Sequence, residues 1–194
     1  MKVVGITGGI GTGKSLVCQI FCRLGVPVYE SDKVVHLLYE KYPEINEKIK
    51  KEFSEDVFDK NGKLNRKKLG EIVFSDAKKL NTLNSIIHPI VKQDFDKWLK
   101  SNKVNSYVIK EAAILFESGA SAICDKIICV ISPIEFRISR VKERDHKSRI
   151  EIENIINKQL SDEELIKRSD FVIYNDEKQM LIPQVLKIHA GFIK

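Results

Sequence analysis

The sequence lacks the features that would assign it to a membrane-spanning or multidomain class. Only five prolines and ten glycines occur in 194 residues, and there is no internal repeat, low-complexity tract or Pro/Gly-rich linker. The longest apolar runs, at 112–116 and 127–131, have the length of strands and are too short to cross a bilayer. These absences exclude a helical membrane protein and predict one globular unit with insertions.

Cysteine is scarce, with four residues at positions 18, 22, 124 and 129. They form neither a CxxC pair nor a regular disulfide framework, and they lie in apolar segments, so we predict buried thiols rather than a metal site. The chain begins Met1-Lys2 and continues without the apolar region and cleavage site of a signal peptide. Together these features predict a cytoplasmic protein.

Positive charge is in excess, with 33 Lys and Arg against 27 Asp and Glu, a formal net charge of +6. This charge admits nucleic acid, an anionic membrane or a polyphosphate ligand as partner and does not choose among them. Basic residues gather at 60–68 and at 137–149. A solvated helix face would explain either cluster as well as a binding site would.

The order of apolar segments predicts an α/β fold with a parallel sheet. Strands are expected at 2–7, 26–29, 106–109, 126–131 and 171–174. A helix over about 14–24 follows the first strand, and Gly25 would end it. Between 32 and 103, apolar residues recur at three- and four-residue spacing, which predicts an inserted helical region. Within it Asn61-Gly62 marks a turn, and Pro89 either kinks a long helix or begins a new one.

The segment after the first strand carries a specific chemistry. It satisfies the pattern G-x-x-x-x-G-K-[ST], between an apolar strand and an amphipathic helix, which is the context of a nucleotide-binding P-loop. Glycines let backbone N–H groups turn toward phosphate, and the helix N-terminus adds a favourable field. Crossover handedness places this loop with the other strand C-termini along one functional rim. The residues expected to bind ATP here are Gly9, Ile10, Gly11, Thr12, Gly13, Lys14, Ser15 and Leu16.

Two side chains of the loop have distinct predicted roles. Lys14 would reach the β- and γ-phosphates as a point charge, and the Ser15 hydroxyl would ligate Mg²⁺, which spreads the charge that develops on the transferred group. A glycine-rich turn with an incidental Lys-Ser is the alternative. The loop predicts nucleotide binding without identifying the acceptor, because motors, GTPases and nucleic-acid enzymes carry it too.

Ordered matches along nearly the whole chain resemble the dephospho-CoA kinase family. The matching segments are Ile6 to Ser15, Leu24 to Val26, Tyr29 to Asp32, Ile87 to Ile90, Ile114 to Gly119, Arg140 with Arg144-Asp145, and Ser169 to Asn175. The resemblance implies ATP-dependent phosphorylation of the ribose 3′-hydroxyl of dephospho-CoA, the last step of coenzyme A synthesis. It also implies a P-loop NTPase three-layer core at about 1–31, 104–134 and 168–194, a helical CoA-side region at 32–103 and a mobile helical lid at 135–167.

The resemblance assigns catalytic roles to charged residues. Asp32 lies where the family has the second Asp after its second strand, and a carboxylate there would orient the acceptor hydroxyl and accept its proton; a helix-capping Asp beside Ser31 is the alternative. Arg140 and Arg144 lie four residues apart, so a helix places them on one face, where they would fold over the ATP phosphates. Solvated helix surface is the alternative for both. We assign Lys14, Asp32 and Arg140 to catalysis.

The same resemblance implies residues for the acceptor and for adenine. His88, before Pro89, would contact the CoA moiety, and Phe116 and Glu117 would line the acceptor pocket. Asn175 would bond adenine. Each residue has a structural alternative. His88 would be a hydrogen-bonded residue at a helix junction, Phe116 and Glu117 would be an apolar strand end followed by a cap, and Asn175 would form a turn.

Three positions depart from the family pattern. Glu30 replaces the first Asp of an Asp-x-Asp, and Lys110 to Ala113 stand where Asp and Pro are usual. Both changes keep a carboxylate, but they alter the distance to which the side chain can extend. Ile155 stands where the family often has a lid arginine. One ATP contact is therefore missing or is supplied by Arg149 or Lys158.

Two other functions are compatible with the sequence. Another P-loop kinase, acting on nucleotides or small alcohols, would share the loop, the helical acceptor region and the arginine-bearing lid. A nucleic-acid-binding ATPase fits the net charge of +6, but it requires longer basic or aromatic surfaces and further motor motifs. We predict dephospho-CoA as the partner, with no nucleic acid and no membrane, and the sequence does not indicate an oligomeric state.

Overall fold

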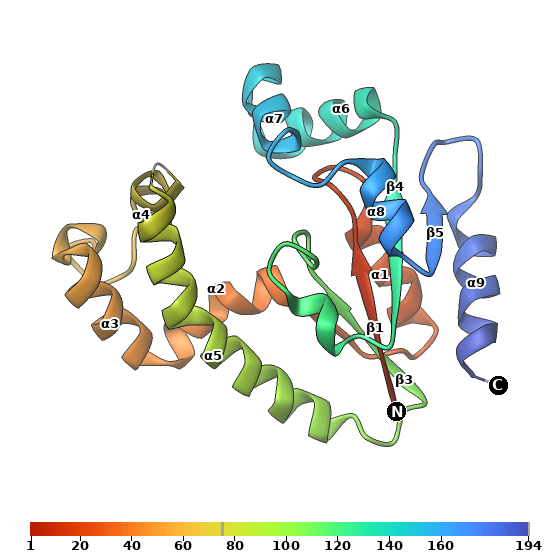
Figure 1. The fold of residues 1–194 in the computed structure, drawn as a ribbon, viewed down its shortest axis with the longest axis horizontal. Helices are drawn as coiled ribbons and strands as arrows, with labels where there is room; N and C mark the ends of the chain where they lie inside the picture. The colour runs from red at the N-terminus through yellow and green to blue at the C-terminus, as the bar shows by residue number, and fades with distance from the viewer. Residues whose placement is uncertain (75, 194) are drawn as a thin grey trace. The chain divides into compact units, whose positions relative to one another are not determined.

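The computed structural model describes residues 1–74 and 76–193, and the chain divides into two compact units (Figure 1). One unit joins Met1–Glu30 to Asn102–Lys194, and the other is Ser31–Ser101. Each has a cluster of buried apolar side chains of its own, so each packs around a separate hydrophobic core.

A parallel sheet forms the centre of the first unit. Its strands are β1 (Lys2–Thr7), β2 (Val28–Glu30), β3 (Tyr107–Glu111), β4 (Lys126–Ile131) and β5 (Phe171–Tyr174), in the order β2-β3-β1-β4-β5. The remaining elements of this unit are α1 (Lys14–Arg23), a 3-10 turn η2 (Ala120–Ile123), α6 (Ile134–Asp145), α7 (Arg149–Ile156), α8 (Asp162–Arg168) and α9 (Leu181–Phe192). The predicted α/β fold with a parallel sheet is confirmed.

Two strands have bounds that differ from the expected ones. The second begins at Val28 rather than at 26, because Pro27 has no N–H to donate to the ladder and only its carbonyl is bonded to β3. The third continues two residues further than expected, to Glu111, which is the register partner of Glu30 on β2. Two carboxylates therefore end neighbouring strands at the same edge of the sheet.

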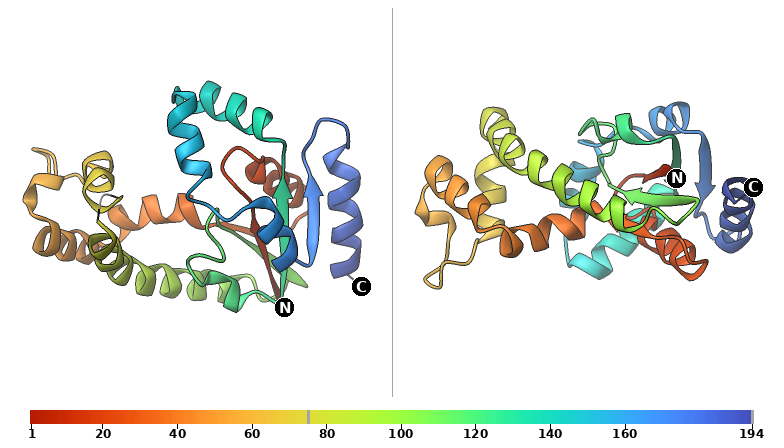
Figure 2. Two further views of the ribbon diagram at one scale, coloured as in Figure 1. Left: turned by 45° about the horizontal axis from the view of Figure 1, so that its top comes forward. Right: turned by 90° about the horizontal axis from the view of Figure 1, so that it is seen from below.

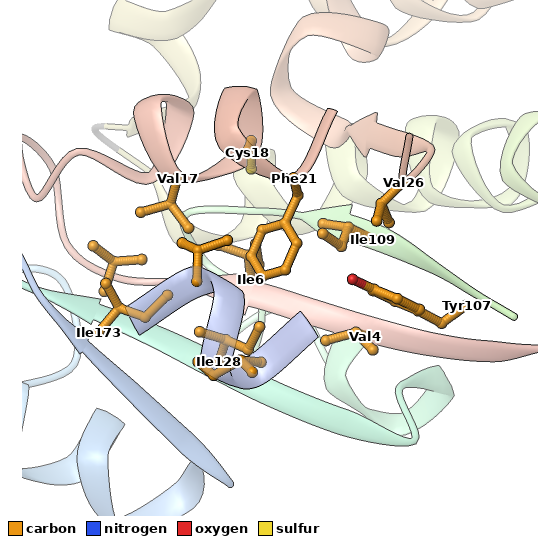
Figure 3. Close-up of a cluster of buried hydrophobic side chains, with 13 residues drawn as sticks. Val4, Ile6, Val17, Cys18, Phe21, Val26, Tyr107, Ile109, Ile128 and Ile173 are labelled. Carbon is orange, nitrogen blue, oxygen red and sulfur yellow. The ribbon is translucent and has the colours of Figure 1, made fainter. Parts of the chain in front are cut away.

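Helices cover both faces of this sheet, and Figure 2 shows α1 and α8 on opposite sides of it. On the α1 side, Val4 and Ile6 of β1 meet Phe21 of α1 and Val185 of α9 in the main core (Figure 3). Alternate residues of a strand face opposite sides, so Gly5 faces the other layer. A Cβ on Gly5 would lie 2.7 Å from Leu115, so the missing side chain lets the segment after β3 pack directly on the strand.

The second unit consists of helices. These are α2 (Ser31–Lys41), α3 (Pro43–Phe53), a 3-10 turn η1 (Glu55–Val57), α4 (Arg66–Phe74) and α5 (Ala77–Ser101). Their apolar faces meet in one cluster that includes Leu38, Ile45, Ile49 and Leu83, as the helical periodicity predicts. The turn at Asn61-Gly62 is also confirmed, since Gly62 has a φ of 74°.

Pro89 lies inside α5, which runs for 25 residues without interruption. Of the two alternatives for Pro89, one long helix is therefore correct. A proline in a helix removes one hydrogen bond and crowds the preceding turn, and the surrounding helix tolerates it because Ile86, Ile87 and Ile90 are buried in the core of this unit.

The cysteines only partly match the prediction of buried thiols. Cys18 and Cys129 are buried and Cys124 is partly buried, but Cys22 is exposed. Cys22 lies one turn beyond Cys18 on α1, at the edge of the stripe made by Val17, Cys18 and Phe21, and a helix turns 100° per residue, which carries position 22 out of the core. Among the described residues, no helix is long and apolar enough to span a bilayer.

Candidate active site

The loop between β1 and α1 has the backbone conformation that its glycines were expected to provide. Gly11 and Gly13 have φ values of 76° and 94°, in the left-handed region that residues with a Cβ rarely adopt. Helix α1 begins directly after the second of them, at Lys14. The N-terminus of α1 therefore opens onto the loop, at the rim where the parallel strands end.

Lys14 is folded against this loop. Its ammonium donates to the carbonyls of Gly8 and Gly9, at 2.8 Å and 3.1 Å, and the residue is buried. The hydroxyl of Thr12 donates to the same Gly9 carbonyl at 2.9 Å. Ser15 is exposed at the start of α1, so its hydroxyl faces solvent on the first helical turn. Both side chains with predicted phosphate or metal roles thus sit on the loop as the motif requires.

Three consecutive carbonyls of the loop accept hydrogen bonds from side chains outside it. These bonds run from Arg137 Nε to Ile10 at 2.9 Å, from Arg140 Nη1 to Gly11 at 3.3 Å, and from Asn175 Nδ2 to Thr12 at 2.8 Å. The carbonyl and the following N–H of a trans peptide point in opposite directions. The N–H groups of Gly11 and Gly13 therefore face the inner side of the loop, where a phosphate would bind.

Arg140 connects the loop to two further segments. Its guanidinium donates to the buried Ser132 hydroxyl at 3.0 Å and pairs with Glu177 at 3.4 Å, and it lies over the ring of Phe136. The side chain is 31% exposed, so part of it remains accessible to a ligand. The Gly11 contact places Arg140 beside the nucleotide loop, on its outer side. Whether the guanidinium also reaches the ATP phosphates stays a prediction.

Arg144 and Asn175 each have a hydrogen-bond partner within the protein, and their proposed contacts with ATP stay predictions. Arg144 is exposed and makes a two-pronged ion pair with the adjacent Asp145 at 2.7 Å and 2.8 Å. This pair raises the pKa of Arg144 and lowers the pKa of Asp145. The Asn175 amide bonds the Thr12 carbonyl, and a Cβ on Gly13 would lie 2.2 Å from its Nδ2. Asn175 thus packs against the phosphate loop itself.

Phe116 and Glu117 lie in the segment after β3. Phe116 is partly buried, packs with Leu115, and has the Arg168 guanidinium 5.9 Å from its ring centre. Glu117 is exposed, and its carboxylate accepts the Leu160 N–H at 3.3 Å. This segment therefore contacts the connection between α7 and α8. Whether these two side chains also bind the acceptor stays a prediction.

The carboxylates that depart from the family pattern stand next to the nucleotide loop. Glu111 is buried and Glu30 is partly buried. Burial, then Glu111, then Glu30 raise the pKa of the Cys18 thiol on α1, and Lys14 lowers it, so all three charges act on the first turns of that helix. With its pKa raised far above neutrality, Cys18 is a packing residue and not a nucleophile.

Asp32 and His88 belong to the helical unit 31–101. Asp32 is exposed in the first turn of α2, where a negative charge also favours the helix macrodipole. In the chain it follows Glu30 of β2 after a single residue. His88 is exposed on α5. Their catalytic and acceptor roles stay predictions.

Two residues that contact the loop were not recognised from the sequence, namely Arg137 and Gln159. Arg137 lies in the basic cluster 137–149, which a solvated helix face would explain equally well, and no motif or pattern indicated a role for Gln159. One sequence signal distinguishes Arg137: it lies three residues before Arg140 on the same helix face, next to the apolar Ile138. Gln159 lies in a connection between helices, where no periodicity indicates which way a side chain points.

Comparison with known proteins identifies the family. A family model described as dephospho-CoA kinase matches residues 2–180. The chain belongs to the dephospho-CoA kinase family. A protein of that name from Fusobacterium nucleatum is 45% identical over 176 residues, which cover 91% of this chain and 90% of the relative.

Solved structures agree with this assignment. A structure from Thermus thermophilus matches with a TM-score of 0.90 and 31% identity, over 100% of this chain and 98% of the other. A dephospho-CoA kinase from Campylobacter jejuni matches with a TM-score of 0.70 and 26% identity, over 97% and 96% of the two chains. The family resemblance read from the sequence is therefore confirmed.

Proposed function

We propose that this protein is an ATP-dependent kinase that phosphorylates the ribose 3′-hydroxyl of dephospho-CoA, giving coenzyme A and ADP. Membership of the dephospho-CoA kinase family over residues 2–180 carries the proposal. The nucleotide loop supports it, because the outward carbonyls of Ile10 and Thr12 leave the N–H groups of Gly11 and Gly13 facing inward for phosphate. Phosphoryl transfer needs positioning and charge stabilisation more than covalent chemistry from the protein, and this loop supplies positioning.

Mg²⁺ fits the groups that the chain offers. Mg²⁺ usually keeps several waters and binds through one or two protein oxygens together with substrate phosphates, so a cage of protein ligands is not required. The exposed Ser15 hydroxyl at the start of α1 would be a direct ligand, and Glu30 and Glu111 would hold water molecules of the ion. When bound there, Mg²⁺ would supply positive charge that offsets the charge developing during phosphoryl transfer.

The acceptor side of the proposal rests on the helical unit 31–101 and the segment after β3. Asp32 would orient the 3′-hydroxyl and accept its proton, and His88, Phe116 and Glu117 would contact dephospho-CoA. Asp32 is exposed at the start of α2, which leaves its carboxylate available to a substrate.

The four cysteines form no disulfide among the described residues, which supports a place in the reducing cytoplasm.

Arg140 is expected to act mainly on the transition state. Arg140→Ala should lower kcat more than it raises the KM for dephospho-CoA, because a guanidinium beside the phosphate loop acts on charge that grows during transfer. Loss of its bond to the Gly11 carbonyl should add a smaller rise in the KM for ATP. Steady-state kinetics with each substrate varied in turn measure the three constants. A change confined to the KM for dephospho-CoA would assign Arg140 to the acceptor site instead.

The proposal is tested by offering several acceptors to the purified protein. Mg-ATP is supplied with dephospho-CoA, nucleoside monophosphates, shikimate or adenosine, and the product is identified by mass. A mass gain of one phosphoryl group on dephospho-CoA, in preference to the others, is the expected result. Preferred transfer to a nucleoside monophosphate or shikimate would assign the protein to another kinase specificity.

A further inference from the structure

Ile10, at the tip of the nucleotide loop, is held by the segment 135–167 on three sides. Its N–H donates to Gln159 Oε1 at 2.8 Å, and its carbonyl accepts from Arg137 Nε at 2.9 Å. Its side chain packs into the small core between α6 and α7, which comprises Ile138, Val141, Ile152 and Ile156. Figure 1 shows the loop between β1 and α1 next to these two helices. One residue of the loop is thus anchored through backbone and side chain together.

Arg137 lies beneath the loop and out of reach of solvent. The residue is 4% exposed, and its Nη1 pairs with Asp162 of α8 at 3.1 Å. Burial lowers the pKa of the guanidinium, and Asp162 opposes this effect. A Cβ on Gly9 would lie 2.0 Å from Arg137 Nη2. The planar guanidinium therefore fills the space under the Gly9-Ile10 peptide and connects it to α8.

Gln159 occupies a fixed position beside the Gly9-Ile10 peptide, whose N–H it accepts, whereas Arg137 bonds the carbonyl of the next peptide. Its own N–H bonds the Ile156 carbonyl at 3.0 Å, at the end of α7. The next residue, Leu160, is bonded through its N–H to Glu117. The turn that carries Gln159 is therefore held at both ends, which sets the direction in which its amide oxygen meets Ile10.

We propose that Arg137 and Gln159 are positioning residues that hold the two peptide groups flanking Ile10 in the orientation required for nucleotide binding. Ile10 then serves as the anchor of the loop rather than as a phosphate ligand, because its N–H is taken by Gln159. Holding the Ile10 carbonyl outward keeps the Gly11 N–H inward. The inference rests on the proposed function only in taking ATP as the nucleotide.

Substitution of Arg137 tests the proposal, because it should weaken binding of the nucleotide and leave the KM for dephospho-CoA almost unchanged. Arg137→Gln should raise the KM for ATP and the Kd for ADP about tenfold, the effect of losing a hydrogen bond from a charged group. The KM for dephospho-CoA should stay within about twofold, because Arg137 contacts the nucleotide loop and α8. Lys142→Gln is the matched control, since it removes one positive charge from the exposed side of the same helix and should leave all three constants unchanged.

Two further variants separate geometry from charge. Arg137→Lys keeps the charge but replaces the two-directional fork by a single point donor, so the ATP defect should persist. Gln159→Leu keeps the approximate size and removes the acceptor of the Ile10 N–H, and it should also raise the Kd for ADP about tenfold. The double variant Arg137→Gln/Gln159→Leu should show less than the product of the single effects, because the two residues hold the two peptide groups that flank Ile10.

The outcomes that overturn the proposal are specific. Wild-type constants in a folded Arg137→Gln variant, full rescue by Arg137→Lys, or a double variant equal to the product of the singles would each refute it. Should Arg137→Gln fail to fold, as judged by circular dichroism, Gln159→Leu decides the matter, because Gln159 is partly exposed. ADP binding by calorimetry needs no acceptor, so failure to phosphorylate dephospho-CoA would refute the proposed function and leave this test intact.

Discussion

Lys14→Ala should reduce kcat about 10³-fold or more while the protein remains folded. A lysine that meets the β- and γ-phosphates stabilises charge in a site shielded from water, where removing one preorganised donor costs about 10²–10³-fold, and here a full charge is lost as well. The ammonium now bonds the carbonyls of Gly8 and Gly9. Loss of these bonds should lower the free energy of unfolding by only about 1 kcal/mol, because water can replace the donor.

The measurement combines a transfer assay with urea unfolding. Lys187→Ala, at an exposed position of α9, is the matched control, since it loses the same side chain far along the chain from the loop and should keep full activity. A folded Lys14→Ala protein with near-normal kcat would refute the assignment of this loop as the ATP site. An unfolded variant would instead assign Lys14 a structural role at the turn.

Asp32→Asn should lower kcat about 10²-fold or more and leave ATP binding almost unchanged. The substitution preserves shape and most hydrogen-bonding capacity but removes the negative charge and basicity that would orient and deprotonate the 3′-hydroxyl. Positioned acid–base groups contribute about 10²–10⁴-fold. The phosphate loop is intact in this variant, so the Kd for ADP should match that of the wild type.

The alternative role of Asp32 leads to a different result. Asp32 lies in the first turn of α2, which begins at Ser31, so a purely structural Asp32 would act through the helix macrodipole. Asn would then cost about 0.3–1 kcal/mol of stability and leave turnover unchanged. A kcat within about threefold of wild type would remove the base assignment. Glu30→Gln and Glu111→Gln would then be the next variants, because these carboxylates end the neighbouring strands.

The nucleotide loop was predictable from local sequence because its requirements are local. Left-handed backbone angles at positions 11 and 13 need glycine. The motif is also recognised by its place between an apolar strand and a helix, and both can be read from neighbouring residues. The same reasoning predicted α1 and β1 within one residue of their bounds. The start of β2 was less accurate, because strand ends depend on which neighbour continues the ladder.

The basic cluster 137–149 illustrates what the sequence leaves open. Its arginines become more exposed along the segment: Arg137 is buried, Arg140 is partly exposed, and Arg144 and Arg149 are exposed. The exposed pair find acidic partners within the same segment, at Asp145 for Arg144 and at Glu153 and Glu135 for Arg149. The buried member finds its partners far away, at Ile10 and Asp162.

The fold class, the phosphate loop, the helical insertion and the family were predictable without coordinates, because strand and helix periodicity and a contiguous motif are properties of neighbouring residues. The bonds from Arg137, Arg140 and Asn175 to successive carbonyls of that loop were not, because they depend on how distant segments pack. These partners lie 127, 129 and 163 residues from the carbonyls that they bond. Contacts at such separations arise from the order of strands in the sheet, which brings the ends of β1, β4 and β5 side by side, and no local pattern encodes that order.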